Sequence, residues 1–128
     1  MFTATTEGVK VSVQTEFQPF YSNAKQQNYV FSYKIHIENE SDQTVQLLSR
    51  HWHIIDGLGF HREVIGDGVI GVQPVIEPGE THSYVSGCNL STFIGKMYGI
   101  YVMERVVDGK RFEVKIPEFM MSPPYLSN

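Results

Sequence analysis

The segment from Tyr29 to Glu38 constrains the fold of this chain more than any other part of the sequence. Apolar side chains stand at every second position, and Lys34, His36 and Glu38 occupy positions between them. Successive side chains of a β-strand point to opposite faces, so a period of two predicts a strand with one buried face. This is the clearest strand signal in the chain, and Asn39 begins the polar segment that ends it.

Similar alternation, or a run of β-branched and aromatic residues, recurs along the rest of the sequence. The predicted strands are 9–17, 29–37, 45–55, 60–65, 81–86, 96–107 and 112–116. The segments 66–80 and 87–92 are predicted loops, the first with one short extended piece, and Asp108-Gly109 predicts a type I′ hairpin turn. Because 96–107 is apolar on both faces, we expect a central strand there, with Gly99 at a bulge or a close backbone approach.

Composition supports an all-β class. The 128 residues include 14 Val and 10 Ile but only 5 Leu and 2 Ala, a balance that favours pleated sheets over helical bundles. We expect an antiparallel immunoglobulin/fibronectin type III-like β-sandwich of about seven strands, with a closed barrel as the alternative. The length fits a single domain, residues 1–128, ending in a short irregular proline-rich tail, 117–128.

Charge and cysteine content restrict the partners and the compartment. The net charge of −4 argues against nucleic acid as a main ligand, since duplex binding depends on clustered Lys and Arg. The single cysteine, Cys88, cannot form an internal disulfide, so we expect a reducing cytosol. The N-terminal residues have neither the basic nor the apolar region of a signal peptide, and no apolar run is long enough to span a membrane.

A glycine motif of the form G-x-G-x-x-G occurs at Gly66, Gly68 and Gly71. In dinucleotide-binding folds these glycines let the backbone approach a pyrophosphate at a helix N-terminus. Here Pro74 follows too closely for a helix, and Asp67 would place negative charge beside a phosphate. We therefore interpret the motif as a loop whose glycines serve turns or close packing, and nucleotide or small-anion binding as the lesser alternative.

Histidines give the sequence its one candidate metal site. His51 and His53 lie on one face of the predicted strand 45–55, opposite Trp52, which we expect in the core. The best third ligand is His61, since the turn at 56–59 brings its strand back, although register decides its face; Asp56 and His82 are further candidates. A stable site normally needs three or four ligands, so we expect only weak binding of Co²⁺ or Zn²⁺.

Evidence for catalysis is weak. Cys88 has His82 nearby in the sequence, but a lone cysteine is more often a small buried hydrophobic side chain than a nucleophile. No serine lies in a G-x-S-x-G turn, and no pair of carboxylates is placed for glycoside hydrolysis. We expect no enzymatic activity and no cofactor.

An ordered set of short motifs over nearly the whole chain resembles the bacterial ApaG family. The matching motifs are Ser49-Arg50-His51-Trp52, Gly66-x-Gly68-Val69-Ile70-Gly71-x-Gln73-Pro74, Ile76-x-Pro78-Gly79-Glu80, Tyr84-x-Ser86-Gly87-Cys88-x-Leu90-Ser91-Thr92, Gly95-x-Met97-x-Gly99-x-Tyr101 and Phe112-Glu113-Val114-x-Ile116-Pro117-x-Phe119. One departure is His53, where the family pattern suggests a more apolar or variable residue, so the histidine pair is a feature of this chain.

The resemblance implies a fibronectin type III-like sandwich in a cytoplasmic protein. It also implies an association with cobalt tolerance and magnesium efflux, without an established transport role or catalytic residues. Similar domains in eukaryotic F-box proteins and a DNA polymerase delta-interacting protein are taken to bind other proteins.

We therefore expect a non-enzymatic protein-interaction module. A homodimer is one assembly that such a module could form. The alternative is a small-anion, nucleotide or divalent-metal binding domain that uses the glycine loop or the histidine face. The candidate partner-binding residues lie in two loops: Gly66, Gly68, Gly71, Pro74, Ser86, Gly87, Leu90, Ser91 and Thr92.

Overall fold

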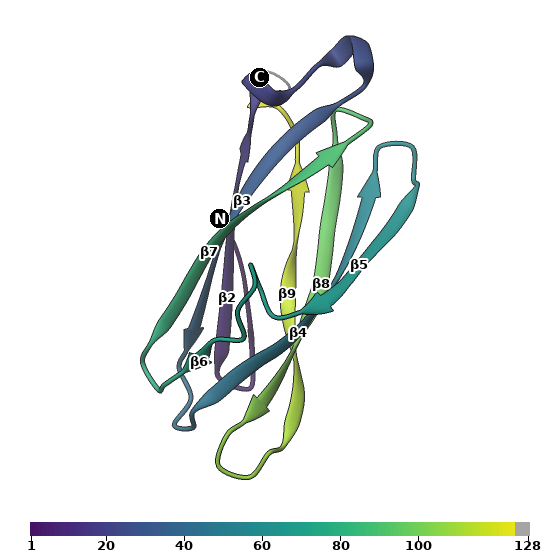
Figure 1. Ribbon diagram of the computed structural model, residues 1–128. Helices are drawn as coiled ribbons and strands as arrows, with labels where there is room; N and C mark the ends of the chain where they lie inside the picture. The colour runs from purple at the N-terminus through teal and green to yellow at the C-terminus, as the bar shows by residue number, and fades with distance from the viewer. Residues whose placement is uncertain (125–128) are drawn as a thin grey trace.

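The computed structural model describes residues 1–124 as two antiparallel β-sheets that pack face to face (Figure 1). One sheet has the order β1-β2-β3-β7, and the other has the order β5-β4-β8-β9, with β6 added to β4. The elements are β1 (Phe2–Thr6), β2 (Val9–Phe17), the 3₁₀ turns η1 (Pro19–Tyr21) and η2 (Ala24–Gln26), β3 (Tyr29–Asn39), β4 (Val45–Asp56), β5 (His61–Asp67), β6 (Val75–Ile76), β7 (Thr81–Leu90), β8 (Gly95–Arg105) and β9 (Arg111–Met121). The predicted all-β sandwich is confirmed.

The core lies between the sheets and follows the alternation of the sequence. Phe31, Ile35 and Ile37 of β3 are at most 1% exposed, and apolar side chains of β4, β8 and β9 cover them from the second sheet. Trp52 is 3% exposed, and its ring centroid lies 5.6 Å from that of Tyr33. The predicted core position of Trp52 is therefore confirmed.

Gly99 permits the close approach of two central strands, as the sequence suggested. A Cβ atom at this position would lie 2.2 Å from the carbonyl oxygen of His51, so a larger residue would push β4 and β8 apart. The pairing of β8 with β9 also shifts between Met97 and Gly99. Pro117 falls within this irregularity, where a residue without an N–H group is tolerated.

Two predicted boundaries were wrong because pairing continues past glycine and proline. β7 runs through Gly87 to Leu90, because each residue keeps a partner on β3 up to the pair Tyr29–Leu90, so only 91–92 of the predicted loop 87–92 lie outside the strand. β9 runs through Pro117 to Met121, so 117–121 are not part of an irregular tail. Residues 125–128 of that predicted tail lie outside the described residues.

The hairpin between β8 and β9 also differs from its prediction. β8 ends at Arg105, so Val106 and Val107 lie in the turn and are exposed. A type I′ turn needs two successive residues with positive φ, and of Asp108 and Gly109 only the glycine has one, at 71°. The Asp108 carboxylate instead pairs with Arg105 across the turn. With β1 and β6 added to the predicted set, the described chain has nine strands rather than about seven.

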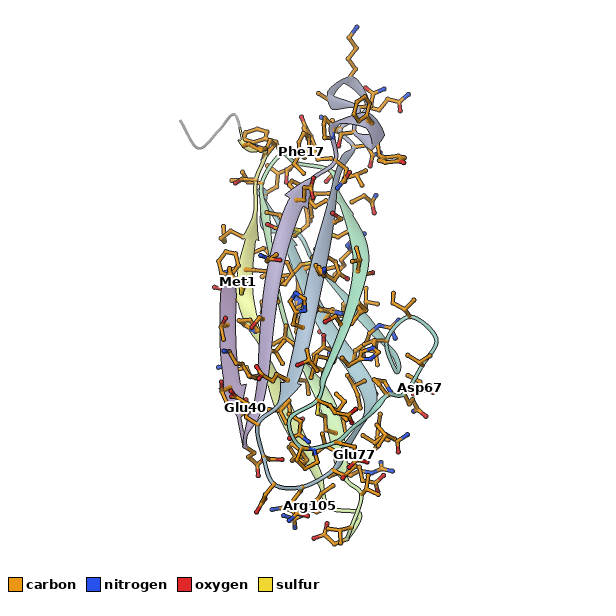
Figure 2. All side chains as sticks on the ribbon, turned by 90° about the vertical axis from the view of Figure 1, so that its left-hand side faces the viewer. Met1, Phe17, Glu40, Asp67, Glu77 and Arg105 are labelled. Carbon is orange, nitrogen blue, oxygen red and sulfur yellow. The ribbon has the colours of Figure 1, made fainter. Side chains whose placement is uncertain are left out.

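The two long sides of the sandwich differ. On one side β1 lies against β9, and the backbone N–H of Lys115 donates a hydrogen bond to Thr6 Oγ1 at 3.1 Å. On the other side, β5 and β7 end their sheets, and no strand of residues 1–124 pairs with their outer edges. Figure 2 shows Met1, beside β1, and Asp67, at the end of β5, on opposite sides of the molecule. The sandwich is thus closed along β1 and β9 and open along β5 and β7.

Candidate functional site

The open side of the sandwich contains a cleft between β5 and β7, which we call the edge cleft. It consists of three adjoining hollows with volumes of about 210, 210 and 200 Å³. The first and second hollows share Arg62 and Asn89, and the second and third share Arg50 and Trp52. The cleft therefore runs along both edge strands, and the apolar core forms its floor.

Two arginines make the central hollow of the edge cleft positively charged in a chain whose net charge is −4, whereas Asp56 and Asp67 line the hollows on either side. Arg50 Nη1 donates hydrogen bonds to the carbonyl oxygens of Asp67 and Gly68, at 3.0 and 2.9 Å. Arg62 reaches across the cleft from β5, where its Nη2 donates to the carbonyl oxygen of Asn89 on β7 at 2.6 Å. Arg50 thus fixes the loop after β5, while Arg62 is the only arginine that joins the two edges within the described chain.

Tyr33 and Tyr84 line the deeper part of the edge cleft, and Tyr101 is buried beneath them. The phenol groups of Tyr84 and Tyr101 share a short hydrogen bond, and Tyr33 lies near Ser86 and Trp52. Burial raises the pKa of Tyr84 and Tyr101 above the ordinary range, and it raises the pKa of Tyr33 as well. These groups therefore stay neutral and act as hydrogen-bond donors and acceptors, not as bases.

Cys88 is a buried thiol, as the sequence suggested. Burial raises its pKa, although the nearby guanidinium of Arg62 opposes the shift, and the thiolate fraction at neutral pH is correspondingly low. His82 lies six positions away on the same strand, roughly 20 Å by the rise of a β-strand. The structure thus does not bring these two residues together as a nucleophile and base.

The glycine loop, residues 66–71, is built for packing. A Cβ atom at Gly66 would lie 2.9 Å from Arg50 Nη1, and one at Gly68 would lie 2.1 Å from the carbonyl oxygen of Val72. Gly68 and Gly71 have φ values of 60° and 76°, which favour glycine. The next element is the short strand β6, so the loop lacks the helix N-terminus on which dinucleotide sites depend.

At one end of the sandwich, hydrogen bonds join the loop 91–94 to the turn after β4. The Thr92 hydroxyl accepts from the N–H of Gly57 at 2.7 Å, and the Ser91 hydroxyl donates to Asp56 Oδ2 at 3.3 Å. Phe93 and Leu58 are exposed beside them and line a further hollow of about 330 Å³. Ser91 and Thr92 thus belong to an ordered rim that continues the edge cleft.

A histidine cluster lies on the outer face of β4 and β5. We define it as His51, His53, His61 and Glu63. His53 Nδ1 and His61 Nε2 are 2.8 Å apart, and a carboxylate oxygen of Glu63 lies 3.5 Å from His53 Nδ1 and another 3.5 Å from His51 Nε2. His53 also stacks on Tyr98, with ring centroids 4.8 Å apart. His61 therefore lies on the same face of the sheet as His53, a point that the sequence left open because it depends on strand register.

The structure brings together only part of the predicted partner-binding set. Five of its residues line the hollows of the edge cleft: Gly71, Ser86, Gly87, Leu90 and Ser91. Thr92 lines the hollow at the end of the sandwich, whereas Gly66, Gly68 and Pro74 are absent from all four linings. Sequence reasoning missed Arg62 and Glu63, although strand alternation places them on opposite faces of β5.

The topology and the open cleft define a two-sheet antiparallel β-sandwich of the immunoglobulin and fibronectin type III kind. A family model described as the ApaG domain matches residues 19–105, and the chain belongs to the ApaG family. It is 47% identical to Protein ApaG of Methylorubrum populi, over 98% of this chain and 96% of that protein, and 43% identical to Protein ApaG of Brucella canis, over 97% and 95%. It also superposes on the crystal structure of a Bordetella pertussis protein named ApaA, with a TM-score of 0.88 and 45% identity over 91% of this chain and 94% of that chain.

Proposed function

We propose that this protein is a non-enzymatic interaction module that binds an extended segment of a partner protein along β7. The observation that carries the proposal is the character of β7 as an edge strand. It is ten residues long and contains no Lys, Arg, Asp, Glu or Pro. Its pairing with β3 is regular from Glu38–Thr81 to Tyr29–Leu90, without a bulge.

Proteins usually protect free strand edges from other chains. Inward-pointing charges, prolines, bulges and short length are the common devices, and β7 has none of them. The other edge strand of the open side, β5, carries Arg62, Glu63 and Asp67. An unprotected edge beside a cleft is the arrangement that proteins use to add a strand from a partner, with backbone hydrogen bonds supplying affinity.

Charge indicates the kind of segment that fits. Alternate side chains of an added strand would point into the edge cleft, toward Arg50 and Arg62. A carboxylate at such a position would pair with Arg62 in place of the carbonyl oxygen of Asn89, which Arg62 now contacts. The partner segment that fits best is therefore an extended strand that carries an acidic residue among the side chains pointing into the edge cleft.

The proposal also accommodates the expected cytoplasmic location and the family association with cobalt tolerance and magnesium efflux. Among residues 1–124 there is no helix that is long and apolar enough to cross a membrane. We propose that any effect on metal tolerance arises through the partner that β7 binds.

Selection from a library of displayed extended peptides tests this function. We expect enrichment of acidic segments that bind the full chain and lose at least tenfold in affinity with Val85→Lys, which puts a charge on the β7 edge. Val107→Lys is the matched control, since Val107 is an exposed valine in the turn between β8 and β9. Equal binding to both variants, or selection of segments without acidic residues, would contradict the proposal. Dimerisation of the chain through β7 without peptide binding would replace the partner with a second copy.

A further inference from the structure

We propose that the histidine cluster is a binding site for a divalent transition-metal ion such as Zn²⁺. This inference is independent of the proposed function, because the central residues of the cluster, His51, His53 and Glu63, line none of the hollows of the edge cleft; only His61 borders the first hollow. The sequence alone indicated only weak binding, because no third ligand was fixed by spacing. The pairing of β4 with β5 supplies the missing ligands.

Cross-strand register brings the donor atoms together. His53 lies directly opposite Glu63, and Ile55 lies opposite His61, so both ligands from β5 share the outer face with the two histidines of β4. One ligand atom from each of His51, His53 and Glu63 lies within 4.8 Å of the others. These three residues form the central ligand set, and the exposed ring of His61 adjoins it through His53.

The distances suit tetrahedral coordination. Zinc binds imidazole nitrogen and carboxylate oxygen at about 2.0–2.1 Å, which places neighbouring ligand atoms about 3.3 Å apart in a tetrahedron. Each oxygen of Glu63 lies 3.5 Å from one imidazole nitrogen, Oε1 from His53 Nδ1 and Oε2 from His51 Nε2, and one ligand atom from each of the three residues lies within 4.8 Å of the others, so a small rotation of the carboxylate completes the geometry. The 2.8 Å between His53 and His61 would lengthen slightly, which an exposed His61 ring can do by rotation.

One buried polar atom of the cluster has no hydrogen-bond partner among the described residues. This atom is His51 Nε2, although it faces Glu63. The 3.5 Å between this nitrogen and the Glu63 carboxylate is longer than a good hydrogen bond, so Glu63 does not satisfy the nitrogen. Buried polar atoms without partners are uncommon and costly, and a metal ion would satisfy this one.

The donor types favour a particular class of ion. Imidazole nitrogens suit Zn²⁺ and similar transition metals, whereas Mg²⁺ prefers a shell of oxygen ligands. The stacking of His53 on Tyr98 holds one imidazole in place, as supporting residues do around established metal sites. We therefore expect Zn²⁺ to bind and Mg²⁺ to fail to compete with it.

Titration of the chelator-treated full chain with Zn²⁺, against a chromophoric chelator, tests the site. We expect submicromolar affinity at one ion per chain, at least a tenfold loss with His51→Ala and with Glu63→Gln, and a smaller loss with His61→Ala. His36→Ala, which removes an imidazole from the outer face of the other sheet, should leave the affinity unchanged. The loss in Glu63→Gln must occur with an unchanged circular dichroism spectrum and melting temperature.

Two further results decide against the site. Affinity weaker than about 100 μM in the unaltered chain would show that the cluster is only a set of ion pairs and stacked rings. An affinity that survives in His51→Ala and Glu63→Gln but disappears in Cys88→Ser would place the ion at the thiol instead. Either result would overturn the proposal.

Discussion

Replacement of Trp52 by alanine should be among the most damaging single changes in this chain. The indole is 3% exposed, and its centroid lies 5.6 Å from Tyr33, 5.9 Å from Phe119 and 6.5 Å from Tyr101. Deleting a large buried aromatic side chain costs about 3–5 kcal/mol through lost burial and the remaining cavity. Domains of this size are stable by only about 5–15 kcal/mol, so the change removes a large share of the total.

Thermal unfolding followed by far-ultraviolet circular dichroism measures this effect. For a chain of 128 residues we expect the melting temperature of Trp52→Ala to fall by roughly 10–20 °C. The melting temperature of Trp52→Phe should fall less, because a ring still meets Tyr33 and Phe119. The free energy of unfolding of Val107→Ala, a control at an exposed site, should change by less than about 0.5 kcal/mol. A Trp52→Ala variant that melts within a few degrees of the unaltered protein would refute the assigned inward face of β4.

Three further predictions concern loops. Gly68→Ala should destabilise the fold by about 1–3 kcal/mol in denaturant titration, because its Cβ would meet the carbonyl oxygen of Val72; Gly71→Ala should cost less, because nothing lies within 4 Å. The carboxyl group of Asp108 should titrate by NMR with a pKa of about 2, lowered by its hydrogen bond with Arg105, and should return toward 3.8 in Arg105→Gln. Its stabilising contribution is thus present above pH 3.8 and is lost as the pH falls through about 2. Calorimetric titration with NAD, ATP or GTP should show no tight binding; micromolar binding that Gly68→Ala abolishes would contradict our interpretation of the glycine loop.

Local sequence pattern predicted the strands whose two faces differ. In β3 every second residue from Phe31 to Ile37 is apolar and buried, and in β4 the alternation separates Trp52 from His51 and His53 correctly. The sequence pattern failed where pairing with a neighbouring strand outweighed the low strand preference of a residue type. Gly87 resembles a loop residue but lies opposite Ser32 in a regular ladder, and Pro117 resembles a strand terminator but falls at a register shift.

The candidate sites depended on register, which a single sequence does not fix. The face of Glu63 relative to His53 follows from the exact pairing of β5 with β4, and a slip of one residue would have moved it to the cleft side. The edge cleft could not be inferred at all from spacing, because it results from which strands end each sheet. Its arginines could have been suspected, since Arg50 shares the inward face of Trp52.

Photo-cross-linking in cells tests the central claim, that β7 binds a partner protein, most directly. A photoreactive amino acid replaces Val85 on the β7 edge or, as the control, Lys115 on the closed side of the sandwich. We predict a cross-linked product from position 85 that contains a second, different protein, is absent from position 115, and disappears when Arg62→Glu is added. Cross-links of equal yield from both positions, or a product from position 85 that contains only two copies of this chain, would contradict the claim.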